Sequence, residues 1–300
     1  MTISGPRVTI AVPVYNGERF LAETLRCLVE QTYQAIEIRI YDNASTDGTA
    51  EICRQFAKSD ARIRYFPHEV NVGSAGNTRR LGAAADGEYF KLANADDLCS
   101  RDMVESCVRV LESRPDVVLC CGQSRLIDVN GNPIRDYHDE MHVCDDDAVH
   151  RFARVVSRIR LTNALQGVGR TEFLRRALSG HGSYDGADMV VLAAAAAWGK
   201  IYQIPRLLFH RRIHQWSTSS KIGDSRAVQE DLDPAKLSAI PAYLTRIHAG
   251  YLAAAFSAPA GVRTRARLAG VVARSLLSQR ASLAREVLGI GRDLLRTKRV

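Results

Sequence analysis

The feature that most constrains the fold is a regular alternation of apolar runs and helical patterns between residues 8 and 121. Runs of strand length alternate with segments whose apolar residues recur at helical spacing, in the order βαβαβαβαβ. This alternation favours an α/β fold, with a mostly parallel sheet flanked by helices. The expected strands are 8–12, 36–41, 62–66, 89–93 and 117–121, and the expected helices are 18–31, 47–58, 74–85 and 101–113.

Two adjacent carboxylates, Asp96 and Asp97, follow the fourth expected strand. Ligands of open α/β sheets bind beyond the carboxyl ends of the strands. Divalent cations such as Mg²⁺ and Mn²⁺ prefer oxygen ligands and often bridge to substrate phosphates. The pair therefore indicates a metal–phosphate site. For an isolated Asp-Asp pair, a solvated loop or a helix N-cap at Asp97 is the commoner interpretation.

Two further turns carry acids. Asp42 ends the second expected strand, where it could accept a hydrogen bond from a ligand or brace the turn, and Asp47 is expected to cap the next helix. A second acid-bearing turn, 183–188, precedes an expected helix. The chain has neither a G-x-G-x-x-G nor a G-x-x-x-x-G-K motif, which argues against dinucleotide-binding and P-loop folds.

The composition of the chain limits the size of its core, its cellular location and the state of its cysteines. The chain has 300 residues and a net charge of +8, and 46% of its residues are apolar, enough for a large core. It lacks an apolar stretch of about 18 residues, and it lacks the pattern of a signal peptide, so we expect a cytoplasmic protein. Its seven cysteines show no C-x-x-C pair, which favours reduced thiols.

Basic residues concentrate in the segment 257–300, whose only acids are Glu286 and Asp293. We expect this segment to form a helical extension that could contact an anionic membrane surface peripherally. The competing interpretation, which we favour slightly, is packing against the rest of the chain or against a second subunit. The apolar stripe at helical spacing on which both interpretations depend consists of Leu268, Val271, Val272, Leu276 and Leu277.

Four motifs occur in a fixed order along the chain. They are Val-Pro-Val-Tyr-Asn at 12–16; Tyr-Asp-Asn-Ala-Ser-Thr-Asp-Gly-Thr at 41–49; Asn71-x-Gly73 with Asn77, leading to Gly-Glu-Tyr-Phe-Lys-Leu and Asp96-Asp97; and Asp188 followed by Arg212-Ile213-His214-x-x-Ser217. In this order and spacing, from Val8 to Ser219, the chain resembles family-2 glycosyltransferases of the GT-A fold.

The resemblance implies a Rossmann-like sheet divided by function. Residues 1–125 would form the nucleotide-sugar-binding half, 126–220 the acceptor-binding half, and 221–300 a basic helical extension. It also implies an inverting, metal-assisted transfer of a sugar from a UDP- or dTDP-sugar to a hydroxyl of a glycan or lipid-linked saccharide, in the synthesis of a cell-surface polysaccharide. Mn²⁺ or Mg²⁺ is the implied cofactor. We expect no nucleic-acid partner, and the sequence leaves a homodimer open.

The resemblance also carries roles onto single positions. Asp188 would be the catalytic base, with Asp185 as a rival because Ala187 replaces the glutamate of the family's Glu-Asp pair. Asp96 and His214 would bind the metal, and Asp97 is a further candidate. The residues that would bind the nucleotide-sugar are Pro13, Val14, Tyr15, Glu18, Asp42, Asn71, Asn77, Asn94, Ala95 and Asp96.

Two other functions compete with sugar transfer. Asn94 stands where many family members have the first acid of their D-x-D metal motif, and Ala187 removes a second acid. Both changes suit a non-catalytic protein that binds a nucleotide or glycan on the same fold. A nucleotidyltransferase ranks below both, because its Gly- and Lys-rich loop after the first strand is missing.

Overall fold

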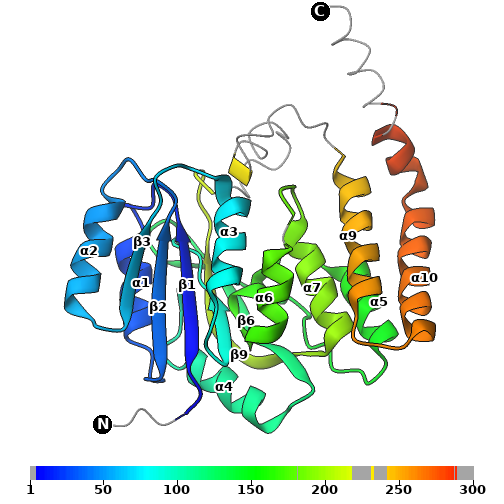
Figure 1. Ribbon diagram of the computed structural model, residues 1–300, viewed down its shortest axis with the longest axis horizontal. Coiled ribbons are helices and arrows are strands. Elements are labelled where there is room, and N and C mark those ends of the chain that lie inside the picture. The colour runs from blue at the N-terminus through cyan, green and yellow to red at the C-terminus, as the bar shows by residue number, and fades with distance from the viewer. Residues whose placement is uncertain (1–4, 181, 218–230, 233–241, 287, 289–300) are drawn as a thin grey trace, which may run out of the picture.

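A single sheet, flanked by helices, forms the body of the molecule (Figure 1). The computed structural model describes residues 5–180, 182–217, 231–232, 242–286 and 288. The strand order is β3-β2-β1-β4-β8-β6-β9-β5, and β7 pairs with β6. The strands are β1 (Val8–Val14), β2 (Ile36–Asp42), β3 (Ile63–Pro67), β4 (Tyr89–Leu92), β5 (Leu98–Cys99), β6 (Val117–Ile127), β7 (Pro133–Tyr137), β8 (Val168–Arg170) and β9 (Lys200–Arg212).

Helices cover both faces of this sheet, so the predicted α/β class is confirmed (Figure 1). One apolar core includes the side chains that α1, α2 and α4 pack against the sheet, and the other includes those of α3, α5, α6, α7, α9 and α10. The described helices are α1 (Leu21–Val29), α2 (Thr49–Ser59), α3 (Gly73–Ala84), α4 (Met103–Ser113), α5 (Ala148–Arg158), the 3₁₀ helix η1 (Asn163–Gln166), α6 (Thr171–Ser179), α7 (Ala187–Trp198), α9 (Tyr243–Ser257) and α10 (Val262–Ser278).

The strand order reverses at β1. This strand pairs in parallel with β2 on one side and with β4 on the other, and the register sets Val14 opposite Asp42. Parallel strands end at the same edge of a sheet, and the point where the strand order reverses leaves a crevice at that edge. The N-terminus of α7 lies at the same end of the molecule (Figure 1). The fold therefore gathers the segments after β1, β2 and β4 on one edge, near the second acid-bearing turn.

The structure departs from the local predictions at three points. Strand β8 was not predicted; it precedes α6 and inserts antiparallel between β4 and β6. Asp47 is not the N-cap, because α2 begins at Thr49 with Gly48 as its cap residue. Asp97 does not cap a helix either, because the two-residue strand β5 separates it from α4.

The C-terminal extension is part of the core. Helices α9 and α10 form a hairpin beside α5 and α7 (Figure 1). Leu268, Val271 and Val272 are buried in the same core cluster as α5 and α7, whereas Leu277 is 64% exposed. The prediction that the stripe packs on the rest of the chain is therefore confirmed for most of its residues. Among the described residues, none of the helices has the length and apolar character needed to cross a bilayer.

Gly167 tests how closely β6 and the η1–β8 connection approach. A Cβ at this position would collide with the backbone carbonyl oxygen of Cys120. We expect Gly167→Ala to lower the free energy of unfolding by about 1–3 kcal/mol, because the strands have to move apart. The matched control is Gly270→Ala in α10, where a Cβ meets no atom within 4 Å and where replacing glycine should stabilise the helix by about 0.5–1 kcal/mol. Urea denaturation measures both, and equal stabilities would contradict the predicted packing.

Candidate active site

The loops that follow β1 and β2 are joined by reciprocal hydrogen bonds. The backbone N–H of Asn16 donates to Ser45 Oγ over 2.9 Å, and Asn16 Oδ1 accepts from the N–H of Thr46 over 2.9 Å. Glu18 Oε2 accepts from the N–H of Gly48 over 2.7 Å. Asn16 has a φ of 49°, a left-handed conformation that asparagine tolerates well. These bonds fix one wall of the crevice. Glu18 is predicted to bind the nucleotide-sugar, and in this structure its carboxylate joins the two loops.

Asp42 also braces its own turn. It is 3% exposed, its Oδ1 accepts from the N–H of Ser45 over 2.9 Å, and its Oδ2 accepts from the Tyr65 hydroxyl over 2.7 Å. Burial and the Asp42 carboxylate raise the pKa of Tyr65, which keeps this phenol protonated as the donor. The turn-bracing role considered for Asp42 is thus observed, and its contact with a nucleotide stays a prediction.

The two predicted asparagines of the α3 region differ in their accessibility. Asn71 is exposed, and its Oδ1 accepts from Asn43 Nδ2 over 2.7 Å. Asn77 is 2% exposed, and its Nδ2 donates to the carbonyl of Tyr41 over 3.0 Å. Asn77 therefore ties α3 to β2. In the first loop, Tyr15 is 49% exposed.

The structure brings Asp96 and His214 together from the ends of β4 and β9. His214 Nε2 lies 2.9 Å from Asp96 Oδ2, and the Asp96 side chain is 30% exposed whereas that of His214 is 4% exposed. The two predicted metal ligands are therefore neighbours. The second ring nitrogen of His214, Nδ1, is buried and has no hydrogen-bond partner among the described residues.

Asp97 points into the protein. Its Oδ1 accepts from the backbone N–H of Arg212 over 2.8 Å, and its Oδ2 accepts from Asn94 Nδ2 over 2.9 Å. Burial, with a smaller contribution from the charge of Asp96, raises the pKa of Asp97 to about 7. Both oxygens are engaged with the fold, so Asp97 and Asn94 hold the strand end in shape beneath Asp96.

Arg212 connects the walls of the site, and the sequence analysis gave it no role of its own. Its side chain is 1% exposed. Nε donates to the carbonyl of Asp96 over 2.9 Å, Nη2 pairs with Glu23 Oε2 over 2.6 Å, and Nη1 donates to the carbonyl of Val129 over 3.0 Å. One guanidinium thus joins α1, the β6–β7 turn, β9 and the strand end after β4. Its place in the Arg-Ile-His motif was the one signal that could have drawn attention to it.

Gln166 is a second residue that the sequence did not single out. Its Oε1 accepts from the N–H of Asn94 over 3.2 Å, and its carbonyl accepts from the buried Lys91 Nζ. The Lys91 ammonium group thus holds η1 against β4 from inside. The segment around Asn94 is therefore held in place by its contacts with η1.

An aromatic group borders the Asp96–His214 pair. The rings of Phe20 and Trp216 lie 4.8 Å and 5.8 Å from the His214 ring, centroid to centroid, and the guanidinium of Arg19 lies 4.0 Å from the Trp216 ring. Trp216 is 51% exposed, so its face remains a candidate platform for a sugar. Trp198, by contrast, packs against Phe173 and Arg176 of α6.

Asp188, the predicted base, lies in the first turn of α7, after Gly186 with its φ of 83°. Both Asp188 and Asp185 are exposed, and partial burial together with the charge of Asp188 raises the pKa of Asp185. Arg79 of α3 donates to Ser183 Oγ over 2.9 Å and so holds this turn beside α3. The turn is thus fixed next to the helix whose N-terminal segment borders the crevice.

The protein itself offers few ligands to a metal. No group of three or more His, Cys, Asp or Glu residues suited to a metal occurs in the described ranges. Asp96 and His214 supply one carboxylate and one imidazole nitrogen. Mg²⁺ and chemically similar ions commonly bind through one or two protein groups, water and substrate phosphates. The residues present therefore fit a cation that is shared with a bound diphosphate.

Residues 9–164, more than half of the chain, match the family model described as glycosyl transferase family 2. Glycosyltransferase GlyG of Streptococcus pneumoniae serotype 4 is 37% identical over 114 residues, which make up 37% of this chain and 38% of GlyG. The match thus spans well under half of that relative.

Two solved structures share the fold. S. aureus TarS (residues 1–349) in complex with UDP-GlcNAc is similar with a TM-score of 0.59 and 14% identity, over 91% of this chain and 73% of that one. Mannosyltransferase PcManGT of Pyrobaculum calidifontis, in complex with GDP-Man and Mn²⁺, has a TM-score of 0.51 and 20% identity, over 97% of this chain and 88% of that one. These similarities, with the α/β sheet described above, show the GT-A fold.

Proposed function

The chain belongs to glycosyl transferase family 2, and we propose that it transfers a sugar from a nucleoside-diphosphate sugar to an acceptor hydroxyl, inverting the anomeric centre. The observation that carries this proposal is the Asp96–His214 pair, with 2.9 Å between His214 Nε2 and Asp96 Oδ2, at the carboxyl end of β4. A donor in the crevice between β1 and β4 would set its diphosphate beside this pair.

The donor is a UDP- or dTDP-sugar in this proposal. Pro13 and Val14 end β1 and Tyr15 follows it, while Asn71 lies between β3 and α3 and Ala95 between β4 and β5. TarS, which shares the fold, was solved with UDP-GlcNAc, whereas PcManGT was solved with GDP-Man. The donor screen described below therefore decides which nucleotide base the protein accepts.

Asp96 and His214 are the residues that would hold a divalent cation, Mn²⁺ or Mg²⁺. When bound, such an ion acts as a Lewis acid that stabilises the charge of the departing diphosphate. Arg212 Nε donates to the backbone carbonyl of Asp96, which helps to position the Asp96 carboxylate. The His214 ring packs against Phe20. Asp97 supports this arrangement from below.

Asp188 is the general base of the proposed reaction. The acceptor oxygen forms a bond to the anomeric carbon while the bond from that carbon to the diphosphate oxygen breaks. The hydroxyl proton passes to the Asp188 carboxylate, and the nucleoside diphosphate leaves. Attack from the face opposite the leaving group requires base and diphosphate on opposite sides of the sugar. Asp96 at the end of β4 and Asp188 at the start of α7 suit that requirement.

The acceptor is a glycan or a lipid-linked saccharide in this proposal, and the product contributes to a cell-surface polysaccharide made on the cytoplasmic side of the membrane. A non-catalytic nucleotide- or glycan-binding protein is the second candidate. It is favoured by the use of Asn94 to brace Asp97 and by the 3% exposure of Ala187, where the family's glutamate would stand.

A donor screen tests the proposal. Purified protein is heated with UDP-, dTDP- and GDP-sugars, with and without Mn²⁺, and hydrolysis of each donor is followed in parallel. A ligand that binds only the folded state raises the melting temperature. We expect one nucleotide class to raise it, more strongly with Mn²⁺, and the Mn²⁺ increment to vanish in Asp96→Ala.

The matched control for the screen is Asp116→Ala, which removes an exposed acid before β6 that pairs with Lys200. It should keep the Mn²⁺ increment. Binding without any turnover would support the scaffold candidate instead, and the absence of a shift with every donor would contradict both proposals.

Substitution of the two acids before and within α7 tests the base. Asp188→Asn keeps the size of the side chain but removes the proton acceptor, so kcat should fall about 10²–10⁴-fold with little change in the KM for the donor. Asp185→Asn is the matched control and should keep most of the activity. The assignment is overturned if Asp185→Asn loses activity in this way while Asp188→Asn keeps it.

A further inference from the structure

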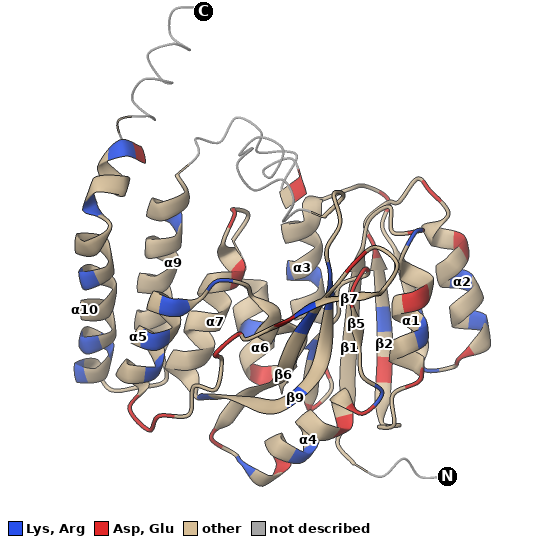
Figure 2. Ribbon diagram, turned by 180° about the vertical axis from the view of Figure 1, so that it is seen from behind, with Lys and Arg blue, Asp and Glu red and all other residues tan. Residues whose placement is uncertain are grey.

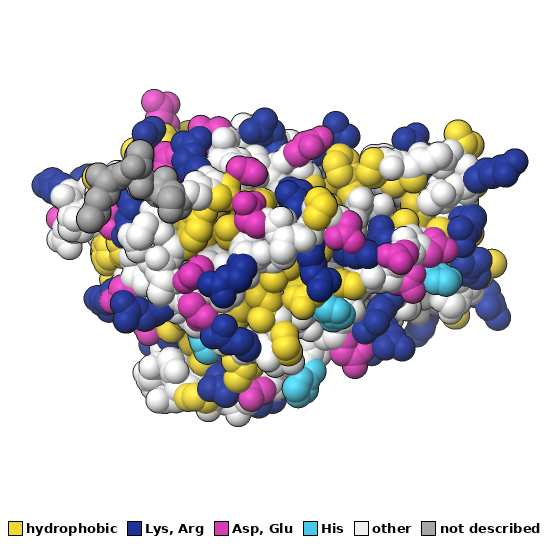
Figure 3. Space-filling view, turned by 90° about the horizontal axis from the view of Figure 1, so that it is seen from below, with side chains coloured by type: hydrophobic (Ala, Val, Ile, Leu, Met, Phe, Trp, Pro, Cys, Tyr) yellow, Lys and Arg dark blue, Asp and Glu magenta, His cyan; other side chains and the backbone are white. Residues whose placement is uncertain are grey.

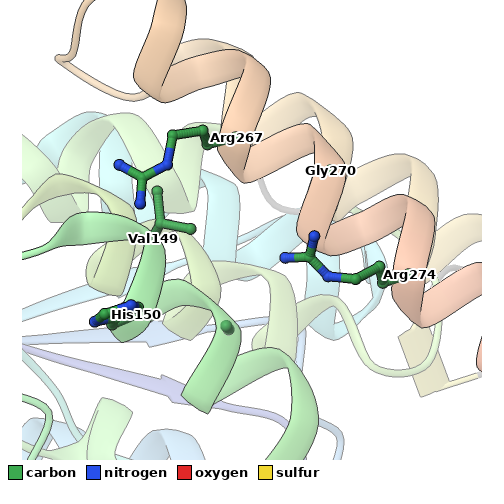
Figure 4. Close-up of a pocket in the computed structure, with 6 residues that line it drawn as sticks. Val149, His150, Arg267, Gly270 and Arg274 are labelled. Atoms are coloured by element: carbon green, nitrogen blue, oxygen red, sulfur yellow. The ribbon is translucent and has the colours of Figure 1, made fainter.

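A groove of about 280 Å³ runs between α5 and α10, away from the crevice of the proposed active site. It is much larger than the ~30 Å³ that one water molecule occupies in the liquid. Figure 4 shows Arg267 and Arg274 extending from α10 on the side where α5 lies, with Val149 and His150 across from them. Val149, His150, Ala153, Arg267, Gly270 and Arg274 line this groove, which we call the α5–α10 groove.

The groove belongs to a basic helix surface. Helix α10 contains four arginines and no acid between Val262 and Ser278, and Figure 2 shows basic bands along it. On the lower face of the molecule, by contrast, acidic and basic side chains are interspersed (Figure 3). Arg263, Arg267, Gly270, Arg274 and Leu277 follow each other at intervals of three and four residues, so they share one face of the helix.

Acids near the groove neutralise only part of this charge. Asp147 Oδ2 pairs with Arg267 over 2.7 Å, and Asp145 Oδ2 lies 3.6 Å from His150 Nδ1. No ion pair of Arg263 or Arg274 occurs among the described residues. Both side chains are exposed. The groove therefore keeps a surplus of positive charge at its Arg274 end, which complements an anion.

We propose that the α5–α10 groove binds the phosphate of an anionic phospholipid headgroup, and that the outward face of α10 docks the protein on an anionic membrane surface. A row of charges along one helix face matches a plane of headgroups better than it matches a single acidic side chain. Exposed apolar residues accompany the row, since Val262 is 82% and Leu277 is 64% exposed. Such residues can enter the headgroup layer.

This docking surface differs from the apolar stripe considered above, because Leu268, Val271 and Val272 pack inside the protein. It goes beyond the proposed function, since adsorption requires neither donor nor turnover. Helix α10 lies on the opposite side of the molecule from α2 and β3 (Figure 1). Contact through α10 therefore leaves the crevice between β1 and β4 uncovered.

Gly270 allows a test that keeps every arginine in place. A Cβ there meets no atom within 4 Å, so a longer side chain fits without disturbing the core. Gly270→Glu adds a negative charge to the groove, and Gly270→Gln is its neutral control of equal size. The full chain is floated with vesicles of phosphatidylcholine alone and with phosphatidylglycerol added, at low and at raised NaCl.

We expect flotation only with phosphatidylglycerol, loss of flotation in raised salt, wild-type flotation of Gly270→Gln, and binding of Gly270→Glu weakened roughly fivefold. Equal binding by the two variants, or no flotation of the wild type, would overturn the proposal. Binding of inorganic phosphate or of duplex DNA, sensitive to Gly270→Glu but without vesicle binding, would assign the groove to another anion and also overturn it. Donor binding is measured on the same samples, so a failure here is distinct from a failure of the proposed function.

Discussion

The buried guanidinium of Arg212 is the interaction on which the rest of the site depends. Its nitrogens hold the Asp96 carbonyl, the Glu23 carboxylate and the carbonyl of Val129, and its backbone N–H holds Asp97. A buried arginine needs all of its donors satisfied, because an unpaired charge in the interior is costly. The three segments that satisfy Arg212 are thereby fixed relative to one another and to β9, and Asp96 and His214 meet above them.

The sequence predicted the architecture well, because strand and helix periodicities are local properties of the chain. It missed β8, because three residues carry too little pattern to separate a strand from the helix that follows. It anticipated the Asp96–His214 pair through an ordered set of motifs. The inward direction of Asp97, the use of Glu18 as a brace and the contacts of Arg212 depend on contacts between segments far apart in the chain, which periodicity does not reveal.

The C-terminal hairpin packs on the domain and also carries the surface that we propose to dock on a membrane. One face of α10 buries Leu268, Val271 and Val272 in the core of the domain, and the other presents arginines to solvent. Glu286 adds a further link, since its carboxylate accepts from the N–H groups of Leu244 and Thr245 at the start of α9. Removal of the whole extension would expose core, so single substitutions on its outer face are the informative ones.

The most direct measurement is the Mn²⁺ affinity of the protein saturated with its nucleoside diphosphate, compared between Arg212→Lys and Arg211→Lys. Lysine keeps the charge but cannot bridge three acceptors in fixed geometry. If Arg212 positions Asp96 and His214, Arg212→Lys should weaken Mn²⁺ binding about 10–100-fold. Arg211→Lys, whose guanidinium contacts Asn163 instead, should bind nearly as wild type does. A folded Arg212→Lys protein with wild-type Mn²⁺ affinity would contradict the account.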